Sequence, residues 1–282
     1  MCANARPRIL MCSPEYFGVE YVINPWMADQ TGKVRPREAM SQWSALYDAL
    51  SPLADITCIA PSPHQPDMVF TANAGMVFGD RFVPSRFRHQ ERAGEEAHFA
   101  CWAEHAAYAI TPLPDDVFFE GAGDALYDRG RPVLWLGYGF RTGLPAASAL
   151  RDIVEPSGLS VQPLRLVDPR FYHLDTCFCP ISGGRLLYYP PAFDPESVRR
   201  IEGAVPEDQR LAVSEEDAEA FACNAVCLNG AIVMNRATSG LKARLGEWGL
   251  RCVETPLGEF MRAGGAARCL TLRLDEPEPV AA

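Results

Sequence analysis

A unit of about 50 residues recurs along the chain. Asn73, Asp124, Asp175, Asn224 and Cys269 occupy equivalent places in it, at intervals of 51, 51, 49 and 45 residues. Around them the pattern predicts a strand, a polar tip, a hairpin, a helix and a further strand. Such units cannot bury their own apolar faces, so five of them must share a core. Arranged around an axis, they would bring the five polar tips together at its mouth.

Hydrophobic periodicity places the elements of these units. Apolar residues at spacings of three and four predict helices at 36–50, 91–110, 144–154, 195–203 and 239–248. The alternation from Cys269 to Leu274 predicts a last strand that begins at the thiol, directly after the flexible pair Gly264-Gly265. The pattern shows no domain boundary, so we expect a single domain over residues 1–274 and a short frayed tail over 275–282.

The composition narrows the class of protein. A formal net charge of −10 disfavours a polyanionic partner such as nucleic acid. Ten cysteines without an export signal are expected to be reduced thiols, and their spacing offers no paired C-x-x-C zinc ligands. The sequence contains no dinucleotide or Walker motif and no apolar stretch of membrane-spanning length. We therefore expect a cytoplasmic enzyme or binding protein without a metal or other cofactor.

Chemically capable side chains gather at the expected tips. The set comprises Asn73, Glu120, Asp124, His173, Asp175, Asn224 and Cys269. A thiol and an imidazole on different units can form a nucleophile and its acid–base partner, and neighbouring carboxylates suit a cationic substrate.

The three residues with the clearest catalytic potential also have a structural interpretation. Cys269 could simply pack inside, His173 could be a hydrogen-bonded structural histidine, and Glu120 could cap a turn. Their coincidence at repeat-equivalent positions favours catalysis. His173 and Asp175 are expected on one face of a strand, and Asn224 is expected to hold backbone rather than substrate.

Three motifs carry a specific resemblance. They are Phe119-Glu120-Gly121-x-Gly123-Asp124, His173-Leu174-Asp175-Thr176 and Gly264-Gly265-Ala266-Ala267-Arg268-Cys269-Leu270-Thr271. Over residues 8–274 the chain resembles the pentein superfamily of guanidine-modifying enzymes, which implies an α/β fold: a five-bladed propeller of ββαβ modules. The resemblance assigns attack on the guanidinium carbon to Cys269, proton transfer to His173 with Glu120 as its partner, and binding of the guanidinium nitrogens to Asp175.

One departure from that superfamily points to a branch of it. Arginine deiminases carry an Asp where this chain has Asn73, and Asn73 together with the segment Tyr21–Met27 around Asn24 resembles the arginine dihydrolases. The same resemblance assigns Asp67, Arg92 and Arg141 to substrate binding, the two arginines at the substrate carboxylate. Surface salt bridges are the alternative for these three residues.

The resemblance thus implies a cysteine-dependent hydrolase of L-arginine or a close analogue, with a covalent amidino-thioether intermediate and no cofactor. The expected partner is a small cationic guanidino substrate, and neither nucleic acid nor membrane. A dihydrolase would release ornithine, ammonia and carbon dioxide. The alternatives are a dimethylarginine dimethylaminohydrolase or arginine deiminase that releases citrulline, an amidinotransferase, and a non-catalytic binding protein of the same fold. The sequence alone does not decide among these functions. It is compatible with a homo-oligomer.

Overall fold

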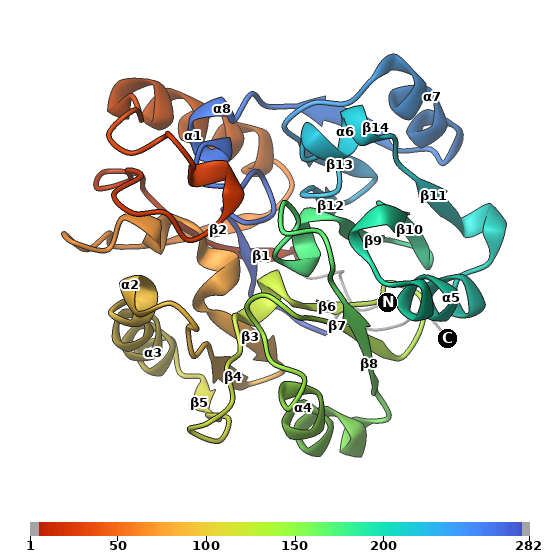
Figure 1. Ribbon diagram of the computed structural model, residues 1–282, viewed down its shortest axis with the longest axis horizontal. Coiled ribbons are helices and arrows are strands. Elements are labelled where there is room, and N and C mark those ends of the chain that lie inside the picture. Colours follow the sequence, from red (N-terminus) through yellow and green to blue (C-terminus); the bar gives the residue numbers. More distant parts are fainter. Residues whose placement is uncertain (1–5, 278–282) are drawn as a thin grey trace.

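The computed structural model describes residues 6–277 and consists of five three-stranded sheets arranged around a central axis (Figure 1). Their strand orders are β15 (Leu272–Arg273), β1 (Arg8–Cys12), β2 (Asp55–Ile59); β3 (Gly75–Phe78), β4 (Arg81–Pro84), β5 (Ala109–Ile110); β6 (Ala125–Tyr127), β7 (Val133–Tyr138), β8 (Ser160–Arg165); β9 (Phe178–Ile181), β10 (Arg185–Tyr188), β11 (Arg210–Ala212); and β12 (Val226–Leu228), β13 (Ala231–Met234), β14 (Arg251–Glu254). The predicted propeller of five ββαβ modules is confirmed.

Each sheet repeats one pairing scheme. The first strand pairs antiparallel with the middle strand, and the middle strand pairs parallel with the third, as β6, β7 and β8 do. Parallel neighbours require a long crossover, which the helices supply. In the first sheet the antiparallel partner of β1 is β15 from the other end of the chain, with Ile9 opposite Arg273. This pairing closes the ring of modules.

The crossover helices lie at the periphery of the molecule (Figure 1). They are α1 (Pro36–Leu50), α2 (Gln90–Ala93) with α3 (Glu95–His105), α4 (Ala146–Val154), α5 (Pro195–Ala204) and α7 (Ser239–Glu247), and the connections add α6 (Glu215–Glu219) and α8 (Gly258–Met261). Sequence explains their starts: Asp194 and Thr238 accept hydrogen bonds from the first-turn N–H groups of α5 and α7, and Pro36 begins α1.

The innermost strands begin later than the sequence pattern indicates, because a single turn precedes each of them. Three of these turns are 3₁₀ helices, η3 (Thr71–Ala74), η4 (Gly121–Gly123) and η6 (Leu174–Thr176). Short 3₁₀ turns are frequent connectors, and their period differs from the alternation of a strand. The remaining 3₁₀ helices are η1 (Pro25–Met27), η2 (Pro66–Val69), η5 (Glu155–Ser157), η7 (Pro190–Ala192) and η8 (Glu207–Gln209).

Two predicted boundaries were wrong. The helix expected over 91–110 divides at Gly94 and ends at His105, and Ala109 instead donates to the Asp80 carbonyl to start β5. The strand expected from Cys269 is a turn up to Leu270, whose N–H donates to the Ala266 carbonyl, and only Leu272–Arg273 is a strand. At Cys269 and Leu270 the backbone therefore forms hydrogen bonds within a turn instead of pairing with a neighbouring strand.

The expected tail over 275–282 lies partly outside the described residues, which end at 277. Asp275 accepts from the backbone of Arg8 and pairs with Arg273, and the buried carboxylate of Glu276 pairs with Arg129. Among residues 6–277, none of the helices combines the length and the apolar character that crossing a bilayer requires.

The middle strands supply the core between the sheets and the helices. Leu187 of β10 is fully buried, whereas Leu144 is 50% exposed. We expect Leu187→Ala to lower the free energy of unfolding by about 2–5 kcal/mol, because it removes buried methyl groups and leaves a cavity. Leu144→Ala is the matched control and should change it by less than about 0.5 kcal/mol. Urea unfolding monitored by tryptophan fluorescence measures both variants, and equal losses would contradict this account of the core.

Candidate active site

The polar tips of the five modules meet at one end of the axis. Asn73 lies in η3, Glu120 and His173 immediately precede η4 and η6, Asp175 lies in η6, and Asn224 and Cys269 lie in the turns before β12 and β15. His173 and Asp175 therefore do not share a strand face, as the sequence pattern indicated, because the backbone between them is a 3₁₀ turn. All six residues are buried.

A ring of hydrogen bonds joins each tip to the next. Asn73 Nδ2 donates to the Glu120 carbonyl, Leu174 N to Asp124 Oδ1, Asn224 Nδ2 to the Asp175 carbonyl, Cys269 N to Asn224 Oδ1, and Ala72 N to the Cys269 carbonyl. The distances are 3.3, 3.0, 3.0, 3.1 and 3.1 Å. Buried polar groups are costly when unpaired, so this ring fixes the mutual positions of the tips.

The thiol of Cys269 lies between two polar side chains. Its Sγ is 3.3 Å from Asp175 Oδ2 and 3.0 Å from Asn224 Nδ2. Asn224 Oδ1 also accepts from the N–H groups of Ala266 and Cys269. Asn224 thus holds backbone, as predicted, but it also contacts the sulfur directly.

The electrostatics of this pair keep the thiol protonated in the free protein. Burial, and then the Asp175 carboxylate, raise the pKa of Cys269 well above its ordinary value. Burial also raises the pKa of Asp175 to about 7, although the nearby Arg268 cation opposes that rise. A cation placed between the two groups would favour the charged form of both.

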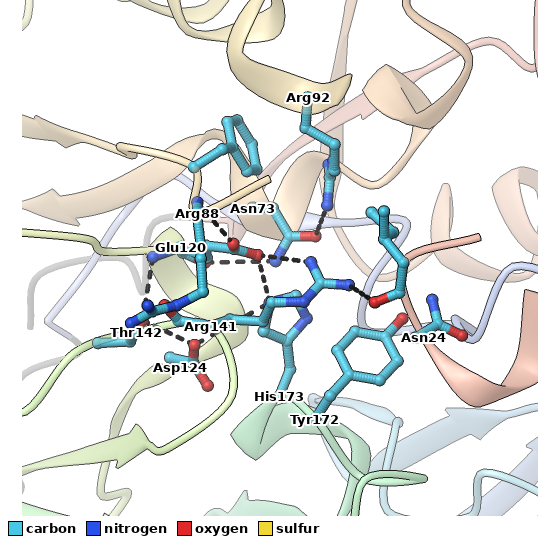
Figure 2. A network of polar contacts seen from close by, with 12 residues as sticks. Asn24, Asn73, Arg88, Arg92, Glu120, Asp124, Arg141, Thr142, Tyr172 and His173 are labelled. Atoms are coloured by element: carbon cyan, nitrogen blue, oxygen red, sulfur yellow. Dashed lines mark hydrogen bonds and ion pairs between the residues drawn. The ribbon is translucent and has the colours of Figure 1, made fainter. Parts of the chain in front are cut away.

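The His173 imidazole is held by a carboxylate that stays ionised. Glu120 Oε2 accepts from His173 Nε2 at 2.7 Å and from Arg141 Nη1 at 3.0 Å (Figure 2). Burial alone would raise the pKa of Glu120, but Arg141, His173 and Arg92 outweigh it and lower that pKa below its usual value. Because an ionised carboxylate only accepts, the proton of this bond lies on His173 Nε2.

A second carboxylate, that of Asp124, is linked to the Glu120 backbone through Thr142. Thr142 Oγ1 accepts from the Glu120 N–H and donates to Asp124 Oδ2 at 2.7 Å (Figure 2). Asp124 Oδ2 is also 4.0 Å from His173 Nε2, and burial raises the pKa of Asp124 to about 6. Thr142 was not anticipated from sequence, since nothing in its neighbourhood marks it.

Arg92 organises another wall of the site. It forms two 2.8 Å bonds to Glu95, and its Nη1 donates to Asn73 Oδ1 at 2.9 Å. Since Arg92 can only donate, it orients the Asn73 amide with Nδ2 toward the Glu120 carbonyl. Asp67 lies 3.9 Å from Arg92 and accepts from Tyr21 at 2.9 Å, and its Oδ1 has no hydrogen-bond partner within residues 6–277.

Arg141 and the loop after β1 form the opposite wall. The Arg141 guanidinium donates to the Ile23 carbonyl and lies 4.5 Å above the Tyr172 ring (Figure 2). Asn24 Nδ2 donates to the Ala263 carbonyl, and Tyr172 donates to Gly264. Asp67, Arg92 and Arg141 are all buried, so the alternative of surface salt bridges is wrong for the three of them.

These walls enclose one small cavity. Its lining includes Asn24, Asp67, Asn73, Arg92, Arg141, Tyr172, His173 and Cys269, while Glu120 and Asp175 contact His173 and Cys269 directly. All nine residues predicted for the site are therefore brought together. The cavity measures about 10 Å³, which is less than one water needs. An amino acid can enter only if part of the wall moves.

Two neighbours of the predicted residues went unnoticed in the sequence. Glu95 follows Arg92 by three residues at the start of a helix, a spacing that typically brings opposite charges together. Tyr172 directly precedes His173, and its hydroxyl donates to the Gly264 carbonyl, which ties the segment that carries the imidazole to the loop before Cys269. Among the described residues no cluster of three His, Cys, Asp or Glu side chains is arranged to hold a metal ion.

Sequence comparison places the chain among guanidine-modifying enzymes. The family model described as "N,N dimethylarginine dimethylhydrolase, eukaryotic" matches residues 13–275. The bifunctional arginine dihydrolase/ornithine cyclodeaminase ArgZ of Synechocystis is 51% identical over 96% of this chain, which spans only 38% of the length of ArgZ. The N(G),N(G)-dimethylarginine dimethylaminohydrolase of Mycobacterium tuberculosis is 38% identical over 95% of this chain and 85% of its own length.

Solved structures agree with the sequence comparison. The N-terminal domain of ArgZ superimposes with a TM-score of 0.94 at 50% identity, covering 98% of this chain and all of that domain. That domain has been crystallised as a cysteine-to-serine mutant bound to substrate, and as an asparagine-to-serine variant covalently bound to a reaction intermediate.

The raised pKa of Cys269 leads to a prediction about alkylation. We expect its iodoacetamide reaction rate to reach half its maximum above the ordinary thiol pKa of 9.0. Asp175→Asn should move this midpoint to lower pH, because it removes the negative charge beside the sulfur. Peptide mass spectrometry measures the rate at Cys269 against that at the exposed Cys101.

The control is Asp208→Asn, which removes an equal charge from an exposed position far along the chain. It should leave the midpoint unchanged. A wild-type midpoint near neutral pH, or one that Asp175→Asn raises, would contradict the proposed electrostatics.

Proposed function

The chain belongs to the N,N-dimethylarginine dimethylhydrolase family, and on that premise we propose that it hydrolyses the guanidino group of L-arginine with Cys269 as the nucleophile. The observation that carries this proposal is the position of the thiol. Cys269 contacts Asp175 and lines the cavity that the His173 imidazole and two buried arginines also line. The chemistry uses protein groups and water alone.

Substrate binding prepares the nucleophile. The guanidinium would lie against Asp175, whose carboxylate faces Cys269, and its positive charge would lower the pKa of both groups. Asp67 offers an unpaired oxygen to the substrate ammonium, and the buried arginines Arg92 and Arg141 suit its carboxylate. Asn24 ties the loop after β1 to the Ala263 carbonyl at this end of the cavity.

The first half-reaction makes a covalent adduct. Sulfur attacks the guanidinium carbon, and His173 carries the thiol proton to one terminal nitrogen, which leaves as ammonia when its bond to carbon breaks. The product is an amidino-thioether on Cys269. His173 then removes a proton from water, which attacks the same carbon and expels the sulfur, leaving a citrulline-like urea. Glu120 stabilises the imidazolium that forms in each step.

A second round would convert the urea to ornithine. Sulfur attacks the urea carbon, a second ammonia departs with a proton from His173, and hydrolysis of the resulting thiocarbamate gives ornithine and carbon dioxide. Two waters are consumed for each arginine. The 51% identity to ArgZ, an arginine dihydrolase, supports this outcome, and the Asn73 amide facing the cavity supports it chemically.

A second candidate is hydrolysis of dimethylarginine to citrulline and dimethylamine. The description of the matching family and the Mycobacterium tuberculosis relative favour it. The same thiol chemistry applies, except that the leaving group is a secondary amine. Incubation of the protein with L-arginine and, separately, with N,N-dimethylarginine distinguishes the two candidates. Ornithine with two ammonia supports the dihydrolase, and dimethylamine supports the alternative.

Replacement of the nucleophile tests the covalent step. We expect Cys269→Ser to retain the fold and to lose turnover by several orders of magnitude, because a serine hydroxyl is far less ionised than a thiol. Cys58→Ser, at an exposed cysteine in β2, should keep wild-type activity. Product analysis by mass spectrometry measures turnover, and acid quench of the wild type should reveal an adduct on Cys269. Near-normal turnover in Cys269→Ser would end the proposal.

Substitution of Asn73 tests whether hydrolysis stops at citrulline or continues to ornithine. An amide can donate to the urea oxygen of the intermediate, whereas a carboxylate would repel it. Asn73→Asp should therefore perform the first round and accumulate citrulline. Arg92 can donate to either side chain, which keeps residue 73 in place, although the 3.3 Å bond from Asn73 Nδ2 to the Glu120 carbonyl is lost. A thermal unfolding curve of the variant therefore accompanies the product analysis. Chromatography of the products over time gives the citrulline-to-ornithine ratio.

The matched control is Asn229→Asp, in an exposed hairpin turn with a left-handed backbone that Asp tolerates. It should leave the product ratio at the wild-type value. Citrulline as the sole product of the wild type, or undiminished ornithine from Asn73→Asp, would overturn the dihydrolase assignment while leaving the cysteine chemistry intact.

A further inference from the structure

Three contacts fix the amide of Asn73. Its Oδ1 accepts from Arg92 Nη1 at 2.9 Å, and its Nδ2 donates to the Glu120 carbonyl at 3.3 Å (Figure 2). A methyl group on Gly123 would lie 2.3 Å from Asn73 Nδ2, so the amide nitrogen packs directly against the glycine backbone. One Nδ2 hydrogen then remains without an acceptor among residues 6–277, and Asn73 lines the active-site cavity.

The bond from Arg92 is the stronger of the two hydrogen bonds. It is shorter and its donor is a cation, whereas the bond to the Glu120 carbonyl joins two neutral groups. Without Arg92, only the longer, neutral bond would oppose rotation of the Asn73 amide. The orientation of this amide therefore depends on the orientation of the Arg92 guanidinium.

Glu95 sets the orientation of Arg92. Its two carboxylate oxygens accept from Arg92 Nε and Nη2, both at 2.8 Å, and such a bidentate pair fixes the plane of the guanidinium. Nη2 also donates to the Asp67 carbonyl at 3.3 Å, and the Phe87 ring packs at 4.4 Å from the guanidinium carbon. With Nη1 on Asn73, one of the five guanidinium hydrogens is left for a ligand.

Glu95 lies behind Arg92 and outside the cavity. It is fully buried and is the first residue of α3, where the N-terminus of the helix favours an ionised carboxylate. Within residues 6–277 the lining of the cavity includes Arg92 but not Glu95. Glu95 can therefore reach a ligand only through the arginine.

A second carboxylate competes for Arg92. Asp67 Oδ2 lies 3.9 Å from Arg92 Nε, which is too long for a hydrogen bond. Among residues 6–277, Asp67 and Glu95 are the two ion-pair partners of Arg92. Loss of the Glu95 charge would leave Asp67 alone to attract the guanidinium, and we expect the resulting shift to withdraw Nη1 from Asn73.

We propose that Glu95 is a positioning residue that decides whether hydrolysis continues past citrulline. It acts through Arg92 on the Asn73 amide, whose remaining Nδ2 hydrogen can donate to the urea oxygen of bound citrulline. The inference rests on the proposed function, because only an enzyme with two rounds of hydrolysis can either release citrulline or retain it. Arg92 also suits the substrate carboxylate, so a change at Glu95 can raise KM as well, but the ratio of products reports on Asn73.

The product ratio tests this inference, because it does not depend on the amount of folded enzyme. With L-arginine as substrate, we expect Glu95→Gln to raise the initial citrulline-to-ornithine ratio at least about tenfold, since the amide loses a hydrogen bond from a charged donor. Gln matches Glu95 in size but offers Arg92 one acceptor oxygen instead of two. Glu95→Asp keeps the charge and should give an intermediate ratio. Chromatography of the early products measures all three proteins.

Two controls separate the orientation of the amide from stability and from charge. Asp217→Asn removes a buried carboxylate that accepts from Thr238 in another module, so it should lower stability and leave the product ratio unchanged. Glu91→Gln neutralises an exposed carboxylate one residue before Arg92 and should also leave the ratio unchanged.

Gly123→Ala displaces the amide by a second route. Its methyl group would overlap Asn73 Nδ2, while the pair of Glu95 and Arg92 stays complete and no buried charge loses its partner. We expect this variant to raise the citrulline-to-ornithine ratio as Glu95→Gln does. A wild-type ratio in Glu95→Gln, or in Gly123→Ala, overturns the inference.

A crystal structure of unliganded Glu95→Gln tests the geometry without turnover. We expect the distance from Arg92 Nη1 to Asn73 Oδ1 to exceed roughly 3.5 Å, the limit of a hydrogen bond. A distance that stays at the wild-type 2.9 Å overturns the role of Glu95. A wild type that releases citrulline alone overturns the proposed second round instead, and the crystal structure then decides whether Glu95 positions Asn73.

Discussion

The hydrogen-bond ring that joins the five tips is the constraint on which the site depends. Each module contributes one short turn, and each turn bonds to its neighbour through a side-chain amide, a carboxylate or a backbone N–H. The ring closes only because β15 returns to pair with β1. Thiol and imidazole come from modules far apart in sequence, so their alignment is a property of closure rather than of any local segment.

The tips carry charges that would be too costly to bury singly. Arg92 is held by Glu95, and Arg141 by Glu120, which also holds His173. Removal of one partner from such a pair is strongly destabilising, while the complete pair need not stabilise the fold at all. Its benefit is geometric, because the donors and acceptors that a substrate would meet are oriented before it arrives.

Sequence reasoning located the tips because repetition exposes equivalent positions even when the local structure is misjudged. The segment predicted as a strand through His173 and Asp175 and the strand predicted to start at Cys269 both contain turns at these residues. The residues still converge, because the repeat fixes which positions are equivalent even when the local structure is wrong by a few residues. What the repeat could not reveal were contacts without a sequence pattern: Asn224 on the sulfur, Thr142 between Glu120 and Asp124, and Tyr172 on Gly264. Burial of Arg92 and Arg141 was equally invisible, because the spacing of an arginine says nothing of its depth.

The same burial explains why a reactive residue can be kept in a protein with other thiols. Free cysteines react as thiolates, and Asp175 together with burial holds Cys269 in the thiol form. A neutral electrophile that enters the free site from solution meets a protonated thiol, whereas a guanidinium cation supplies the charge that stabilises the thiolate and the ionised form of Asp175. Selectivity would then arise before any chemistry, from the requirement that the ligand itself complete the electrostatic balance of the cavity.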